Sequence, residues 1–101
     1  MSLLKKYKPE NFKALSRLAS ETMKEGALSV KIKELLAVVL SIAMHCEPCI
    51  KIHLRRALQA GATEEEIAET LGVTVLMCGG PADVWPVRII EEELQKAKAP
   101  G

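Results

Sequence analysis

The sequence has 101 residues, which suits a single domain over residues 1–101, and its 14 basic and 13 acidic residues leave it nearly uncharged. It has no basic cluster and only three aromatic residues, so it lacks the positive patch and stacking rings on which nucleic-acid binding depends. The longest apolar stretch, Leu35 to Met44, is too short to cross a membrane, and no secretory signal pattern opens the sequence. We therefore expect a cytoplasmic protein with no nucleic-acid or membrane partner.

The apolar spacing predicts helices throughout, and no strand-like alternation is present. Pro9 suits a first helical turn, Ser29 an N-cap, and Thr63 with Glu66 a capping box. Pro86 predicts a kink in the last helix, because proline removes an internal hydrogen bond. The helices are expected over residues 9–26, 29–44, 46–61, 63–80 and 81–97.

Two of these helices are apolar on every side instead of along one stripe. They carry Leu35, Leu36, Val38, Val39, Leu40 and Ile42 in one case and Val73, Val75, Leu76 and Met77 in the other. A helix that is apolar all round must be buried all round. Because five short helices can hardly enclose two such helices, we expect a homo-oligomer.

The chemistry of the chain is concentrated in Cys46, Cys49 and His53. At 100° per residue these three positions fall within about 60° of one another on a helix. A pair of cysteines this close in a reducing compartment is typical of redox or metal-binding proteins. The helix N-terminus and the imidazole one turn beyond Cys49 both favour the reactive thiolate. The cluster therefore predicts a thiol oxidoreductase with His53 as the base.

Other interpretations of this cluster stay open. His45, Cys46, Cys49 and His53 supply the ligand types of a Cys₂His₂ zinc site, although four ligands on one helical segment would strain a tetrahedron. His45 is otherwise a helix-end residue. The cysteines can also be ordinary apolar residues of a non-catalytic assembly subunit.

Several other residues have structural interpretations. Cys78, on an apolar helix, is expected in the core, and Gly79-Gly80-Pro81 is expected to stop one helix and start the next. Arg55 and Arg56 are expected on a solvated face. From spacing alone, Glu34 is also a solvent-exposed residue.

Taken together, these motifs resemble the AhpD-like alkylhydroperoxidase branch of the carboxymuconolactone decarboxylase superfamily. The matching segments are Glu34-Leu35-Leu36-Ala37, Cys46-x-x-Cys49-x-x-x-His53, residues 60–67 (AGATEEEI) and Gly79-Gly80-Pro81. The resemblance covers roughly residues 30 to 85. It implies an all-α domain of about five helices, with the C-x-x-C at a helix N-terminus, that forms homotrimers or homohexamers.

The resemblance also implies a thiol-dependent peroxidase of peroxiredoxin-type activity that reduces hydrogen peroxide or alkyl hydroperoxides. Cys49 would attack the peroxide, Cys46 would resolve the oxidised sulfur, His53 would be the base and Glu34 a distal member of the proton relay. No metal or organic cofactor is implied, and electrons would come from a dithiol, a lipoyl or a thioredoxin-type donor. A general disulfide reductase is the alternative. Members that decarboxylate lactones generally lack the C-x-x-C, so we do not expect that reaction.

Overall fold

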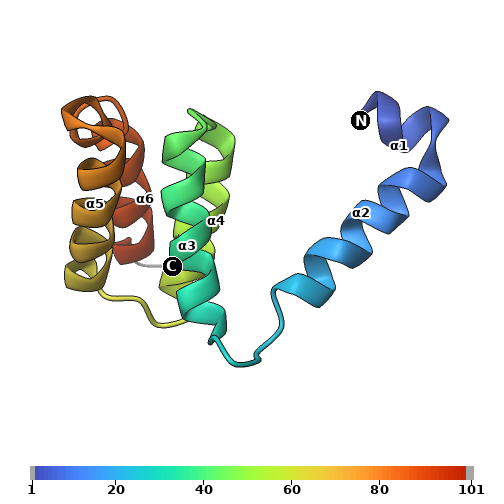
Figure 1. Ribbon diagram of the computed structural model, residues 1–101, viewed down its shortest axis with the longest axis horizontal. Coiled ribbons are helices and arrows are strands. Elements are labelled where there is room, and N and C mark those ends of the chain that lie inside the picture. The colour runs from blue at the N-terminus through green and yellow to red at the C-terminus, as the bar shows by residue number, and fades with distance from the viewer. Residues whose placement is uncertain (1, 100–101) are drawn as a thin grey trace.

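The computed structural model describes residues 2–99, and over that range it contains helices and no strand (Figure 1). The all-α fold expected from the sequence is confirmed. None of the described helices is long and apolar enough to cross a membrane. The elements are α1 (Leu3–Tyr7), α2 (Pro9–Thr22), α3 (Val30–Ala43), α4 (Glu47–Gln59), α5 (Glu64–Cys78), the 3₁₀ helix η1 (Gly80–Asp83) and α6 (Val87–Lys98).

Helices α3 to α6 pack into one unit, and α1 and α2 stand away from it as an N-terminal arm (Figure 1). The most extensive packing joins α3 to α4, while α6 covers α4 and α5 covers α3. No residue of α1 or α2 is buried. The buried core therefore lies entirely in the α3–α6 unit, and it consists of Val38, Ile42, Ile50, Leu54, Ala57, Ala62, Ile67, Ala82, Ile89 and Ile90.

The caps expected from the sequence are present at two helix starts. Ser29 Oγ accepts a hydrogen bond from the Ile32 N–H at 3.1 Å, which begins α3. At the start of α5, Thr63 Oγ1 accepts from the Glu66 N–H at 3.1 Å, and Glu66 Oε1 accepts from the Thr63 N–H at 2.9 Å, so the capping box is confirmed. The Lys31 ammonium and the Thr63 backbone hold the pKa of Glu66 below its usual value.

Two of the predicted helices differ from the structure in their extent. The first helix begins at Pro9 as expected, but it ends at Thr22 instead of Gly26 and is preceded by the unpredicted α1. The expected single helix over residues 81–97 is two elements, because Pro81 lies in η1 and Pro86 is the N-cap of α6. An N-cap needs no intrahelical N–H, so Pro86 costs no hydrogen bond there and kinks nothing.

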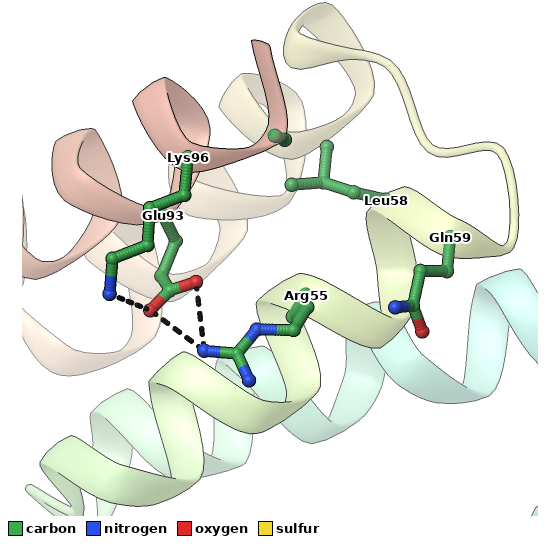
Figure 2. A pocket seen from close by; sticks show the side chains of 6 residues that line it. Arg55, Leu58, Gln59, Glu93 and Lys96 are labelled. Atoms are coloured by element: carbon green, nitrogen blue, oxygen red, sulfur yellow. Dashed lines mark hydrogen bonds and ion pairs between the residues drawn. The ribbon is translucent and has the colours of Figure 1, made fainter. Parts of the chain in front are cut away.

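A cluster of ion pairs joins α4 to α6 beside a pocket of about 390 Å³ (Figure 2). Glu93 of α6 is only 2% exposed, and Nη2 of Arg55 lies 3.3 Å from both of its carboxylate oxygens. Lys96 Nζ lies 3.4 Å from Oε1 of the same group. Arg55 is half-exposed, as expected for a residue on a solvated face. Its guanidinium also neutralises a buried carboxylate, which was not expected.

Arg55→Ala should lower the free energy of unfolding by about 1–2 kcal/mol, because it removes the main partner of the buried Glu93 carboxylate, although the exposure of Arg55 weakens the pair. The exposed neighbour Arg56, which has no ion pair with any residue in the range 2–99, is the matched control, and Arg56→Ala should stay within about 0.5 kcal/mol of the parent. Urea unfolding of the three proteins at one fixed protein concentration measures this. Equal losses for both variants would contradict the structural role of Arg55.

Candidate redox site

A tight turn between α3 and α4 places the first cysteine. After the C-cap of α3 at Met44, His45 adopts a left-handed backbone conformation with φ 55°. The His45 N–H donates to the Ile42 carbonyl at 3.0 Å, and the Cys46 N–H donates to the Ser41 carbonyl at 2.9 Å. This is the Schellman pattern of helix ends, with histidine where glycine is usual. The backbone N–H of Cys46 is thereby hydrogen-bonded to the end of α3, and Cys46 is also the residue at which α4 starts.

Cys46 is the N-cap of α4, and Glu47, Pro48 and Cys49 are the first three residues of the helix. Pro48 fits there because the first helical turn has no intrahelical acceptors for its N–H groups. The Cα atoms of Cys46 and Cys49 lie 5.2 Å apart, inside the usual range for a disulfide, and the structure joins the two residues in one. Both cysteines are partly buried at the positive end of the α4 dipole.

Glu34 of α3 and His53 of α4 form a hydrogen-bonded pair, with Oε2 of the carboxylate 2.8 Å from Nδ1 of the ring. The Glu34 side chain is 3% exposed and that of His53 is 26% exposed. The expectation from spacing that Glu34 is solvent-exposed was therefore wrong. Its neighbours Lys31 and Lys33 do reach outward, to Glu66 and to the end of α2, but Glu34 points between the two packed helices.

The Glu34 contact has a direct consequence for the His53 ring. An ionised carboxylate can only accept hydrogen bonds, so its partner Nδ1 must carry a proton. In the neutral ring this leaves Nε2 as the unprotonated acceptor. No buried side-chain polar atom of the described residues lacks a hydrogen-bond partner. The pair therefore holds a base in one tautomer and one orientation, on the helix that carries Cys49 one turn earlier.

His45 does not join the cysteines in a ligand cluster. Its ring stacks on Trp85, with ring centroids 4.6 Å apart and planes 12° from parallel. Among residues 2–99 no group of three or more His, Cys, Asp or Glu side chains is arranged to hold a metal ion. The zinc hypothesis needs His45 as a fourth ligand, so the geometry lends it no support. No role was predicted for Trp85 from the sequence. The one feature that could have singled it out is that it is the only tryptophan in the sequence.

The third cysteine was misplaced by the sequence interpretation. Cys78 is the last residue of α5, where it is a free thiol and solvent-exposed instead of buried. An apolar helix predicts a core only if something covers each of its faces, and the C-terminal end of α5 is uncovered: Leu76 and Met77 are exposed as well. The stop after it is as expected, because Gly79 ends α5 with φ 92° and η1 follows.

The helical fold and the Cys46–Cys49 pair define an all-α protein with a disulfide-forming dithiol site. The family model described as "Carboxymuconolactone decarboxylase family" matches residues 9–92, and the chain belongs to this family. The AhpD-like branch suggested by the sequence motifs is consistent with that membership.

Two solved structures with similar folds support membership of this family, and one relative of similar sequence is also found. A carboxymuconolactone decarboxylase family protein from Legionella pneumophila superimposes with a TM-score of 0.84 at 37% identity, over 93% of this chain and 84% of that one. A family protein from Thermotoga maritima, described with a suspected involvement in the antioxidative response, has a TM-score of 0.77 at 36% identity, over 87% of this chain and 93% of that one. An uncharacterized protein of Cupriavidus necator is 32% identical over 77 residues, which are 76% of this chain and 68% of that protein.

Mild peroxide treatment of the reduced protein should convert Cys46 and Cys49 from dithiol to disulfide, because their Cα separation already suits the bond. Alkylation followed by mass spectrometry should then show two thiols lost. The exposed Cys78 should be alkylated before and after treatment, and so serves as the internal control. Loss of the Cys78 thiol with Cys46 and Cys49 still alkylated would contradict the site assignment.

Proposed function

We propose that the protein is a thiol-dependent peroxidase that reduces hydrogen peroxide or an organic hydroperoxide with the Cys46–Cys49 pair. The observation that carries the proposal is the combination on α4: a disulfide-forming pair at the helix N-terminus and, one turn on, a histidine held by a buried carboxylate. The antioxidative role suspected for the Thermotoga relative supports the same chemistry.

In the first step His53 takes the thiol proton of Cys49 through Nε2, while Nδ1 stays bonded to Glu34. The Cys49 thiolate attacks one peroxide oxygen, so that an S–O bond forms and the O–O bond breaks. The leaving oxygen takes a proton and departs as water or as an alcohol. Cys49 is then a sulfenic acid, and the peroxide has been reduced by two electrons.

In the second step the Cys46 thiol attacks the oxidised sulfur of Cys49. A sulfur–sulfur bond forms, the S–O bond breaks, and water leaves. The two electrons that regenerate the dithiol come from a dithiol donor of lipoyl or thioredoxin type, which becomes a disulfide in exchange. The cycle as written uses no metal or organic cofactor.

The division of labour between the cysteines rests on two competing effects. The helix dipole favours Cys46, the more N-terminal residue, as the thiolate, and its place at the N-cap strengthens that effect. The base favours Cys49, which lies one turn from His53. We assign the attack to Cys49, because the histidine one turn away can accept the thiol proton and keep it on its ring. The sulfur of Cys49 is then left as the reactive thiolate.

Dimedone labelling of the single-cysteine variants tests this assignment. Cys46→Ser should consume about one equivalent of peroxide and leave a sulfenic acid on Cys49 that dimedone traps. Cys49→Ser should reduce no peroxide and leave Cys46 unlabelled. The reverse labelling, on Cys46 in Cys49→Ser and absent from Cys49 in Cys46→Ser, would exchange the two roles.

His53→Ala should slow peroxide consumption with dithiothreitol by about 10²–10⁴-fold, the usual range for loss of a general base. Glu34→Gln keeps a neutral acceptor for Nδ1 and should cost less, while changing the pH dependence of the rate. The exposed Glu65 gives the control Glu65→Gln, which should match the parent. A parent protein that reduces a model disulfide with dithiothreitol but consumes no peroxide would instead be a general disulfide reductase.

A further inference from the structure

The N-terminal arm has an apolar face that the described residues 2–99 leave largely exposed. On α2, Leu15 is 56% exposed and Leu18 is 64% exposed. At 100° per residue Phe12, Leu15 and Ala19 lie on one side of the helix, and Leu18 borders them. The opposite side carries charged and polar residues. This is the pattern of a helix that packs along one face, yet no residue of α2 is buried.

Hydrogen bonds at the end of α2 join the linker after the arm to α3. Lys33 Nζ of α3 donates to the backbone carbonyls of Thr22 at 2.8 Å and Lys24 at 2.6 Å, at the C-terminal end of α2. The Glu25 carboxylate accepts from the Val30 N–H at 3.0 Å, at the start of α3. The linker between the two helices is therefore held in a conformation that directs α2 outward (Figure 1).

An apolar groove lies between α3 and α5, on the packed unit itself. Its volume is about 230 Å³, and it is lined by Ile32, Leu35, Leu36, Val39, Thr70 and Val73. Several of these side chains are half-exposed, including Leu36 and Val73. An apolar groove of this kind is the usual receptor of an amphipathic helix, which inserts anchors spaced three and four residues apart. The spacing of Phe12, Leu15 and Ala19 on α2 meets that requirement.

The charges of the arm and of the rest of the chain are complementary. Residues 2–24 carry six basic and two acidic side chains, a net charge of +4, and residues 25–101 carry eight basic and eleven acidic ones, a net charge of −3. Glu65 and Glu69 of α5, one or two turns before Val73, have no ion pair among the described residues. A basic arm is therefore attracted to the acidic unit of another copy and steered onto it.

We propose that α2 of one copy packs into the α3–α5 groove of a second copy, and that the copies assemble by this exchange of arms. Each copy gives one helix and receives one, so a closed assembly covers the exposed face of α2 and the groove together. This would cover the apolar side chains of α3 that line the groove. It goes beyond the proposed peroxidase chemistry and does not depend on it.

Leu15→Glu in the arm and Val73→Glu in the groove test the proposal from both sides, since each puts a charge at the contact without touching the core. Light scattering at micromolar concentration should give several times 11.0 kDa for the parent and a lower mass for both variants, with helical circular dichroism unchanged. Ser20→Glu, which adds the same charge on the polar side of α2, should keep the parent mass. A variant mass equal to that of the parent would overturn the proposal.

Two further outcomes distinguish other uses of the arm. In chains with Cys46, Cys49 and Cys78 changed to serine, Leu15→Cys and Val73→Cys proteins should cross-link to each other on mixing and mild oxidation, while Ser20→Cys and Val73→Cys should not. Cross-links only between like chains would overturn arm exchange. A monomeric parent that binds vesicles containing phosphatidylserine, with binding lost in Leu15→Glu, would make the arm a membrane-binding helix instead.

Discussion

A carboxylate taken out of water costs several kcal/mol unless hydrogen bonds or an opposite charge replace its hydration. At Glu34 that compensation comes from the His53 ring on the neighbouring helix. The contact forms only if α3 and α4 lie side by side with residues 34 and 53 at the same level. This register requires a reversal of the chain within a few residues of Met44. The left-handed His45 supplies it, and the Cys46 N–H closes the turn. The constraint that satisfies one buried carboxylate thus also sets the first cysteine at the start of α4.

Local signals were the ones that could be predicted from the sequence. The N-cap at Ser29 and the capping box of Thr63 and Glu66 depend on residues within one turn, and both are present in the structure. The C-x-x-C at a helix start is of the same kind. Proline is ambiguous by comparison, because it fits either an N-cap or a kinked helix interior, and Pro86 takes the first of these.

The burial of individual side chains depends on tertiary packing and could not be predicted from residue spacing. Glu34 lies among lysines in the sequence, and only the approach of α4 turns it from a solvated residue into a buried partner of His53. The prediction for Cys78 failed in the opposite direction, because an apolar helix indicates burial without showing which of its faces the other helices cover. For Glu34 the family resemblance supplied what spacing did not. The function assigned to it remains a prediction that the variants address.

Helix α3 is apolar on nearly every side, and its different sides contact different parts of the structure. One side packs on α4 and holds Glu34 against His53, and another packs on α5. The groove between α3 and α5 lies along its outer edge, and the proposed arm of a second copy would lie there. Lys33, next in sequence to Glu34, ties the chain's own arm to the same helix. In the proposed assembly the contact between copies and the redox site would share one helix, because α3 carries both the groove and Glu34, the hydrogen-bond partner of His53.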